Sequence, residues 1–204
     1  MMASIDVYYD FRSPYAYFAA HRLHNREIDG HGWRWCPVSI DVLLNVQAGR
    51  EPWAPYSDPL SAPKRAHLIA DVRRLAAYYD LPLRAPRPAR PNSVPALCLA
   101  ALIDQPARAM FTIAVFDALW CEQKDIADPE VLAACLVCAG ASSELVSGAF
   151  TEQARSRLAE QTQEAYARGI FGVPSFAVGT EIFFGNDRLD LMRWTIERRA
   201  GSGP

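Results

Sequence analysis

The sequence contains no run of apolar residues long enough to cross a bilayer, which takes about 20 residues in a helix. It also lacks a basic N-terminal segment followed by a short apolar stretch, the pattern of a secretory signal. Positive charge is not in excess, because 21 Lys and Arg against 23 Asp and Glu give a formal net charge of −2. We therefore expect a cytoplasmic protein that does not associate with membranes. Nucleic acid is excluded as the main partner, because phosphate neutralisation requires a basic surface.

Cysteine is scarce, and its odd number excludes a complete disulfide framework. The five residues lie mostly in apolar helical stretches and are expected to be reduced, buried thiols: Cys36, Cys98, Cys121, Cys135 and Cys138. The single Cys-x-x-Cys, Cys135–Cys138, falls inside a predicted helix and has no second ligand pair, which argues against zinc. The four histidines show neither triad nor metal spacing. We expect no metal site.

The first 40 residues read as a strand, a helix and a second strand. Ile5–Tyr9 is strand-like, a helical pattern runs from Tyr15 to about Ile28, and Gly32–Val38 alternates and is rich in aromatic residues. This order predicts a βαβ unit with parallel strands. A chain of 204 residues, half of them hydrophobic, can bury a core of one large domain or of one domain with an insertion.

Helical periodicity dominates the middle of the chain. It predicts helices over Ile40–Val46, Lys64–Tyr79, Asn92 or Ser93 to about Ile103, about Ala107–Cys121, Pro129–Ala139 and Ser142–Phe150. Residues 48–63 interrupt them with four prolines, Trp53 and Tyr56. A long loop with aromatic content is either a lid or a packed connection, and both readings stay open.

The last 54 residues predict a helix, a β-hairpin and a helix. A charged amphipathic helix spans Thr151–Arg168, strands are expected over Ile170–Gly179 and Glu181–Phe184, and a final helix over Arg188 to about Arg199. A βαβ unit followed by an αββα unit is the thioredoxin arrangement. We therefore predict an α/β, thioredoxin-like fold formed by residues 1–40 and 151–204, with an all-helical insertion domain over residues 41–150.

Ser13 and Pro14 stand where the first strand passes into the first helix. Serine is a good N-cap and proline a good first helical residue, so the Ser13 hydroxyl is expected at the positive end of a helix. Open α/β sheets bind ligands just past the carboxyl ends of their strands. A Ser-Pro pair is also common as a simple cap, so the position alone does not decide between the two roles.

Three motifs resemble the 2-hydroxychromene-2-carboxylate isomerases, relatives of kappa-class glutathione transferases in the DsbA-like branch of the thioredoxin superfamily. They occur in this order: Asp10-Phe11-Arg12-Ser13-Pro14-Tyr15, Phe171-Gly172-Val173-Pro174-Ser175-Phe176 and Phe184-Gly185-Asn186-Asp187-Arg188-Leu189. Each motif is weak alone, but their order and spacing around a helical insertion are specific. A weaker match is Lys64, which opens a helix containing Asp71 and Arg74.

The resemblance implies a glutathione site. Where DsbA-like oxidoreductases carry Cys-x-x-Cys, this chain has Ser13 and Ala16, so the protein cannot itself exchange disulfides there. The family binds glutathione with its sulfur facing the serine hydroxyl, and it places a cis-proline, here Pro174, after a residue whose backbone pairs with glutathione, here Val173. Lys64 is expected to reach the glycyl carboxylate, and Asn186 and Asp187 the γ-glutamyl end, although each could be only a helix-start residue or cap.

The resemblance also implies a reaction. The family interconverts 2-hydroxychromene-2-carboxylate and trans-o-hydroxybenzylidenepyruvate, and a thiolate that adds reversibly to the substrate permits rotation about its double bond. Phe11, Tyr15 and Tyr17, with Trp53 or Tyr56, are expected to form aromatic walls. Arg87 and Arg188, or Arg90, are candidates for the substrate carboxylate.

Three points stay open at the level of sequence. A kappa-like transferase or a non-catalytic thioredoxin-like binding module would share the same sulfur site. The Asn-Lys-Pro segment often seen in kappa enzymes is absent, because the loop reads Pro55-Tyr56-Ser57-Asp58-Pro59. A homodimer is expected only because relatives commonly form one.

Overall fold

The computed structural model describes residues 4–25, 32–55 and 60–201. The strands are β1 Ser4–Tyr9, β2 Gly32–Pro37, β3 Ser175–Val178 and β4 Glu181–Phe184. The α-helices are α1 Pro14–His24, α2 Ile40–Gln47, α3 Ala62–Tyr78, α4 Val94–Leu102, α5 Ala107–Trp120, α6 Pro129–Cys138, α7 Glu152–Ala167 and α8 Leu189–Gly201. Two 3₁₀ helices complete the order, η1 Ser143–Phe150 and η2 Asn186–Arg188. No helix in these ranges is both long and apolar enough to span a membrane.

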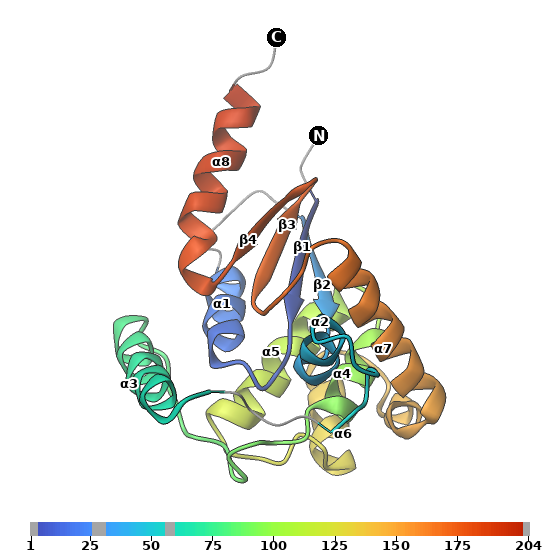
Figure 1. The fold of residues 1–204 in the computed structure, drawn as a ribbon. Helices are drawn as coiled ribbons and strands as arrows, with labels where there is room; N and C mark the ends of the chain where they lie inside the picture. Colours follow the sequence, from blue (N-terminus) through green and yellow to red (C-terminus); the bar gives the residue numbers. More distant parts are fainter. Residues whose placement is uncertain (1–3, 26–31, 56–59, 202–204) are drawn as a thin grey trace.

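The four strands form one mixed sheet in the order β2-β1-β3-β4. β1 and β2 are parallel with Tyr8 opposite Cys36, whereas β3 is antiparallel to both β1 and β4. In Figure 1 the sheet lies between α1 and α8 on one side and α7 on the other, and α2, α4, α5 and α6 gather near the ends of β1 and β2. The predicted thioredoxin-like arrangement of strands and its helical insertion are confirmed.

Alternation along β1 builds a separate core on each face of the sheet. Val7 and Tyr9 belong to the larger core, which also holds the inner faces of α1, α4 and α5. Tyr8 points the other way and packs with Ala165 of α7 and with Ile170 and Val173. Since successive strand residues face opposite sides, β1 is buried on both faces, as expected for a central strand.

Two predicted elements differ from the structure. The strand expected over Ile170–Gly179 is only β3, because residues 170–174 run as a turn that ends in a cis peptide between Val173 and Pro174. The helix expected over Ser142–Phe150 is the 3₁₀ helix η1. Of the proline-rich stretch, residues 48–51 and 55 are exposed, and residues 52–54 are anchored to α2, because Asn45 Nδ2 donates to the carbonyls of Pro52 and Ala54 at 3.0 and 2.8 Å. Tyr56 lies outside the described residues.

A buried carboxylate ties the sheet to α7. Asp6 of β1 is only 5% exposed, and it accepts from Arg34 Nε of β2 at 2.6 Å and from Arg168 Nη1 at 3.0 Å. Burial alone would raise the pKa of Asp6, but the hydrogen bonds and charges of the two arginines hold it below its ordinary value of 3.8. The folded protein therefore keeps Asp6 ionised at a pH where the unfolded chain is already protonated.

This shift predicts acid sensitivity. Because the native pKa of Asp6 is lowered, its stabilising contribution is present above about pH 4 and is lost as the pH falls through the native value. We expect the free energy of unfolding to fall more steeply between about pH 5 and pH 2 in the wild type than in Asp6→Asn. Urea unfolding across this range measures both slopes, and parallel slopes would contradict the assignment.

Candidate active site

Ser13 caps α1 at the carboxyl end of β1, as predicted. Its backbone is extended, Pro14 is the first helical residue, and Ser13 Oγ accepts from the N–H of Ala16 at 3.2 Å. The side chain is buried at 6% exposure. The hydroxyl therefore lies among the first N–H groups of α1, where the helix favours negative charge.

The proton of this hydroxyl is held only weakly. Ser13 Oγ donates to the carbonyl of Val173 at 3.4 Å, longer than the 2.5–3.0 Å of a typical O–H···O bond. Its lone pair is meanwhile engaged by Ala16. The Ser13 hydroxyl can therefore redirect its hydrogen bond from the Val173 carbonyl to an incoming anion while it still accepts from the N–H of Ala16. Ser13 can thus serve as helix cap and as anion ligand at the same time.

Asp10 organises the turn that presents Ser13. Its side chain has 0% exposure. Oδ1 accepts from the N–H of Arg12 at 2.9 Å and from Ser93 Oγ at 2.8 Å, while Oδ2 accepts from the N–H of Ile40 at 2.9 Å. The Asp10 carbonyl accepts from the N–H of Ser13 at 3.0 Å. One carboxylate thus joins the β1–α1 turn to the starts of α2 and α4.

Arg12 extends from the same turn into a surface cavity. Its two terminal nitrogens lie 3.1 and 3.0 Å from the two carboxylate oxygens of Asp41, and Arg90 reaches the same carboxylate at 2.8 Å. The three residues line a cavity of about 220 Å³. A cavity of about 510 Å³ adjoins it, sharing Asp41, and carries the aromatic rings of Trp53 and Phe150.

The Val173–Pro174 segment lies against the start of α1. The peptide bond is cis, which confirms the prediction for Pro174. The Pro174 carbonyl accepts from the N–H of Gly185 at 2.9 Å, which joins this segment to the end of β4. Within the described ranges no acceptor engages the N–H of Val173, a buried backbone donor. Because buried N–H groups are nearly always paired, an acceptor on a bound ligand would be favoured at this position.

Asn186 and Asp187, the two residues expected at the γ-glutamyl end, follow β4 and differ in exposure. Asn186 is buried, its Nδ2 donates to the hydroxyl of Tyr79 at 3.2 Å, and its carbonyl accepts from Arg22 Nη1 at 2.8 Å. Asp187 is 65% exposed and lies 3.6 Å from Arg188. Gly185, rather than either residue, occupies the cap position of η2. Asn186 therefore fastens the turn, while Asp187 stays accessible.

The backbone conformation at position 185 requires a glycine. Its φ is +110°, and an added Cβ would lie 2.5 Å from Asp187 Oδ1. We expect Gly185→Ala to cost about 1–3 kcal/mol of stability, since non-glycine residues are strained in this region. Gly32→Ala, whose Cβ would meet nothing within 4 Å, is the matched control. Urea unfolding of both variants tests this, and equal losses would contradict it.

Comparison with known proteins agrees with this geometry. The family model described as a DSBA-like thioredoxin domain matches residues 4–197. A 2-hydroxychromene-2-carboxylate isomerase of Sphingobium xenophagum is 30% identical over 94% of this chain and 97% of its own length. One of Pseudomonas sp. (strain C18) is 31% identical over 100% of this chain and 93% of its own length. The chain belongs to the 2-hydroxychromene-2-carboxylate isomerase family of DsbA-like thioredoxin-fold enzymes.

Solved structures support this isomerase-family assignment. A structure of 2-hydroxychromene-2-carboxylate isomerase has a TM-score of 0.81 at 27% identity and covers 97% of this chain and 96% of its own. The cytosolic disulfide reductase DsbM from Pseudomonas aeruginosa with GSH has a TM-score of 0.65 at 18% identity, covering 97% of this chain and 98% of its own. At that identity DsbM shows the shared fold alone.

Two residues predicted for the isomerase-family site involve α3: Lys64 belongs to it, and Tyr15 of α1 contacts it. Lys64 is exposed in its first turn. Tyr15, two residues after Ser13, is half-buried and donates from its hydroxyl to Asp71 Oδ2 at 3.0 Å. Burial and this carboxylate raise the pKa of Tyr15 to about 12, so the phenol stays protonated at neutral pH. Tyr15 thus links the start of α1 to α3.

The structure corrects two of the expected aromatic walls. Phe11 and Tyr17 each have 0% exposure. The Phe11 ring packs edge-on against Phe111 and Phe116, and the Tyr17 hydroxyl donates to the carbonyl of Pro82 at 2.6 Å. Both rings are core residues, because helix α5 of the insertion covers them, and neither presents a surface to a substrate.

The two arginines expected at the substrate carboxylate lie at the protein surface. Arg87 is exposed on the loop between α3 and α4, and Arg188 is exposed and paired with Asp187. Arg12, which directly precedes Ser13 in the β1–α1 turn, was assigned no role from the sequence. An arginine inside the strand-to-helix motif was the available signal, and Asp10, directly after an apolar strand, was a second.

Proposed function

We propose that the protein is a glutathione-dependent isomerase that interconverts 2-hydroxychromene-2-carboxylate and trans-o-hydroxybenzylidenepyruvate. The observation that carries the proposal is the Ser13 hydroxyl at the start of α1, 3.4 Å from the carbonyl of Val173, in a chain of this isomerase family. Because Ser13 and Ala16 replace a Cys-x-x-Cys, the reactive sulfur has to come from a bound thiol.

Glutathione fits the groups that the chain leaves open. The N–H of Val173, which no acceptor of the described residues engages, and its weakly engaged carbonyl suit strand-like pairing with the cysteinyl unit. Lys64 supplies a cation for the glycyl carboxylate, and Asp187 an exposed carboxylate for the γ-glutamyl amine. Asn186 supports this end through Tyr79 and Arg22.

Bound glutathione supplies the thiolate whose reversible addition turns the substrate double bond into a rotatable single bond. The chain's own contribution is to hold that sulfur charged. Ser13 donates its hydroxyl proton, and the α1 terminus adds its partial positive charge. A free thiol has a pKa near 8.5 and would be largely protonated at neutral pH. Lowering this pKa by one unit requires about 1.4 kcal/mol of stabilisation of the thiolate.

We place the aromatic substrate in the two cavities beside Arg12. Trp53 and Phe150 provide aromatic surface, and Arg12 and Arg90 provide positive charge for the substrate carboxylate. We also propose that residues 1–40 and 151–204 form the thioredoxin-like unit, and that residues 41–150 are the inserted helical unit, which contributes Lys64 to the glutathione site. A cytoplasmic homodimer completes the proposal, and light scattering of the purified protein tests the dimer.

A mixture of protein, glutathione and 2-hydroxychromene-2-carboxylate tests the function. We expect the chromene to be isomerised with no net loss of glutathione. Consumption of glutathione would instead indicate a kappa-like transferase. A non-catalytic binding module would raise its thermal midpoint with glutathione, as any native-state ligand does, yet turn over nothing. No turnover and no thermal shift together would overturn the proposal.

A further inference from the structure

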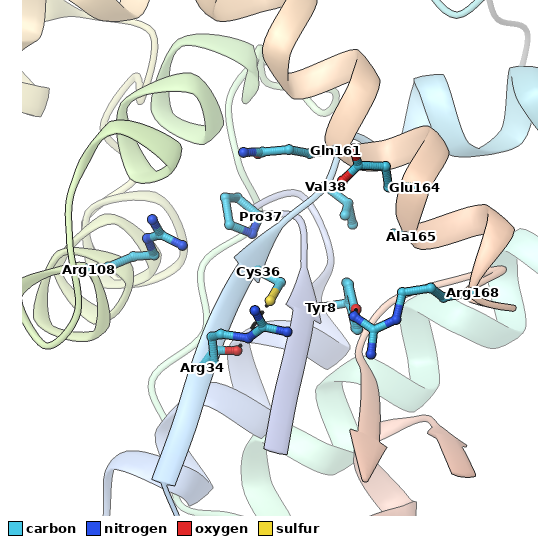
Figure 2. Close-up of a pocket in the computed structure, with 10 residues that line it drawn as sticks. All are labelled: Tyr8, Arg34, Cys36, Pro37, Val38, Arg108, Gln161, Glu164, Ala165 and Arg168. Carbon is cyan, nitrogen blue, oxygen red and sulfur yellow. Dashed lines mark hydrogen bonds between the residues drawn. The ribbon is translucent and has the colours of Figure 1, made fainter. Parts of the chain in front are cut away.

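A third cavity, of about 210 Å³, opens on the α7 face of the sheet. We call it the arginine cavity, because Arg34 of β2, Arg108 of α5 and Arg168 at the end of α7 all line it. In Figure 2, Arg34 and Arg168 extend toward each other from opposite sides of Tyr8, and Arg108 lies on the α5 side. None of these residues takes part in the Ser13 site.

The arginines are held in place but not neutralised. Arg34 uses Nε and Nη2 to bind Asp6, and Arg168 uses Nη1 for both Asp6 and the hydroxyl of Tyr8. Arg108 donates to the carbonyls of Ala101, Ile103 and Trp35, and no described carboxylate lies within ion-pair distance of it. The side chains of Arg34 and Arg168 are half exposed, at 56% and 49%, so solvent can reach them. Guanidinium groups fixed by such contacts are already ordered for a further ligand.

The charged groups around the cavity are not balanced and would be balanced by one more anion. Three arginines face two carboxylates, Glu164 on the wall and Asp6 beneath it, which leaves an excess of one positive charge. A guanidinium presents a planar fork of donors that matches a carboxylate. A single carboxylate therefore balances both the charge and the donors that remain on Arg34 and Arg168.

Apart from the amide of Gln161, the remaining lining is mostly apolar. Pro37, Val38 and Ala165 form wall surface beside the ring of Tyr8 and the thiol of Cys36. Burial raises the pKa of Cys36 to about 11, so its thiol stays neutral and adds no negative charge. A cavity of about 150 Å³ accepts a benzene ring, so about 210 Å³ accommodates one ring with a carboxylate.

We propose that the arginine cavity binds a small organic monocarboxylate. The carboxylate of this ligand lies between Arg34 and Arg168, and the apolar part of the ligand lies against Pro37, Val38 and Ala165. The site is separate from the one that holds glutathione and does not depend on the isomerase activity.

Calorimetric titration of the full-length protein with benzoate tests the proposal. We expect saturable binding that Arg168→Gln and Arg34→Gln each weaken about tenfold or more, since each removes one side of the carboxylate clamp. Arg193→Gln, on exposed α8, is the matched control and should leave binding unchanged. Ser13→Ala should also leave it unchanged, which separates this site from a substrate site beside Ser13.

Three results would overturn the inference. The first is no binding of benzoate, or binding that neither glutamine variant weakens. The second is equal binding of neutral benzamide, which would indicate an apolar hole without anion recognition. The third is equal binding of inorganic phosphate, which would show that the apolar part of the ligand does not contribute to binding. Should both glutamine variants fail to unfold cooperatively in urea, Arg168→Lys keeps the charge without the fork, and undiminished benzoate binding by this variant would overturn the proposal.

Discussion

Ser13→Ala is expected to reduce kcat/KM for glutathione-dependent isomerisation by about 10- to 100-fold. A hydrogen bond to a charged group contributes about 1.5–3 kcal/mol, and each 1.4 kcal/mol is a factor of ten. Glutathione should still bind, because Val173, Lys64 and Asp187 are untouched. The pKa of the bound thiol should rise by about 1 to 2, which thiolate absorbance in the ultraviolet measures directly.

Ser39→Ala is the matched control for this variant. Ser39 caps α2 as Ser13 caps α1, is equally buried and accepts from the N–H of Val42 at 3.4 Å. Each variant loses one N-cap, worth about 1 kcal/mol of stability. Only Ser13→Ala should change the thiol pKa and turnover. Equal turnover in the two variants would show that Ser13 is a cap without a role in the chemistry.

The parts of this site that the sequence predicted are local in the chain. A strand, a Ser-Pro pair and a helix follow one another within residues 4–24, so the position of Ser13 depends only on neighbouring residues. The hairpin and most helices were predictable for the same reason. Pro174 was assigned a cis peptide from its motif, and the structure has one.

The features that the sequence did not predict correctly depend on contacts between residues far apart in the chain. Phe11 and Tyr17 follow the same pattern as exposed aromatic residues near a site, but α5, about a hundred residues later, covers them. Arg34, Arg108 and Arg168 are far apart in sequence and meet only because α5 and α7 pack beside β2. Periodicity describes one element at a time, so it cannot report which elements share a cavity.

Asp10→Ala is expected to destabilise the protein by about 3–5 kcal/mol, because it removes a buried charge and leaves its partners without an acceptor. Those partners are the N–H groups of Arg12 and Ile40 and the hydroxyl of Ser93. They start or flank three separate elements, so the loss is not confined to one turn. Urea unfolding measures it. Asp128→Ala, which removes the exposed N-cap of α6, should cost only about 1 kcal/mol.

Asp10→Asn separates the stability of the turn from its effect on Ser13. The amide keeps one acceptor, but its NH₂ group must face a donor, Ile40 N–H or Arg12 N–H. We expect a folded variant of intermediate stability in which the N–H groups of Arg12 and Ile40 no longer share one carboxylate, so that the turn presenting Ser13 is held less firmly. The pKa of bound glutathione should then rise, as in Ser13→Ala but by less. A destabilised variant with an unchanged thiol pKa would show that Asp10 supports the fold without positioning the hydroxyl.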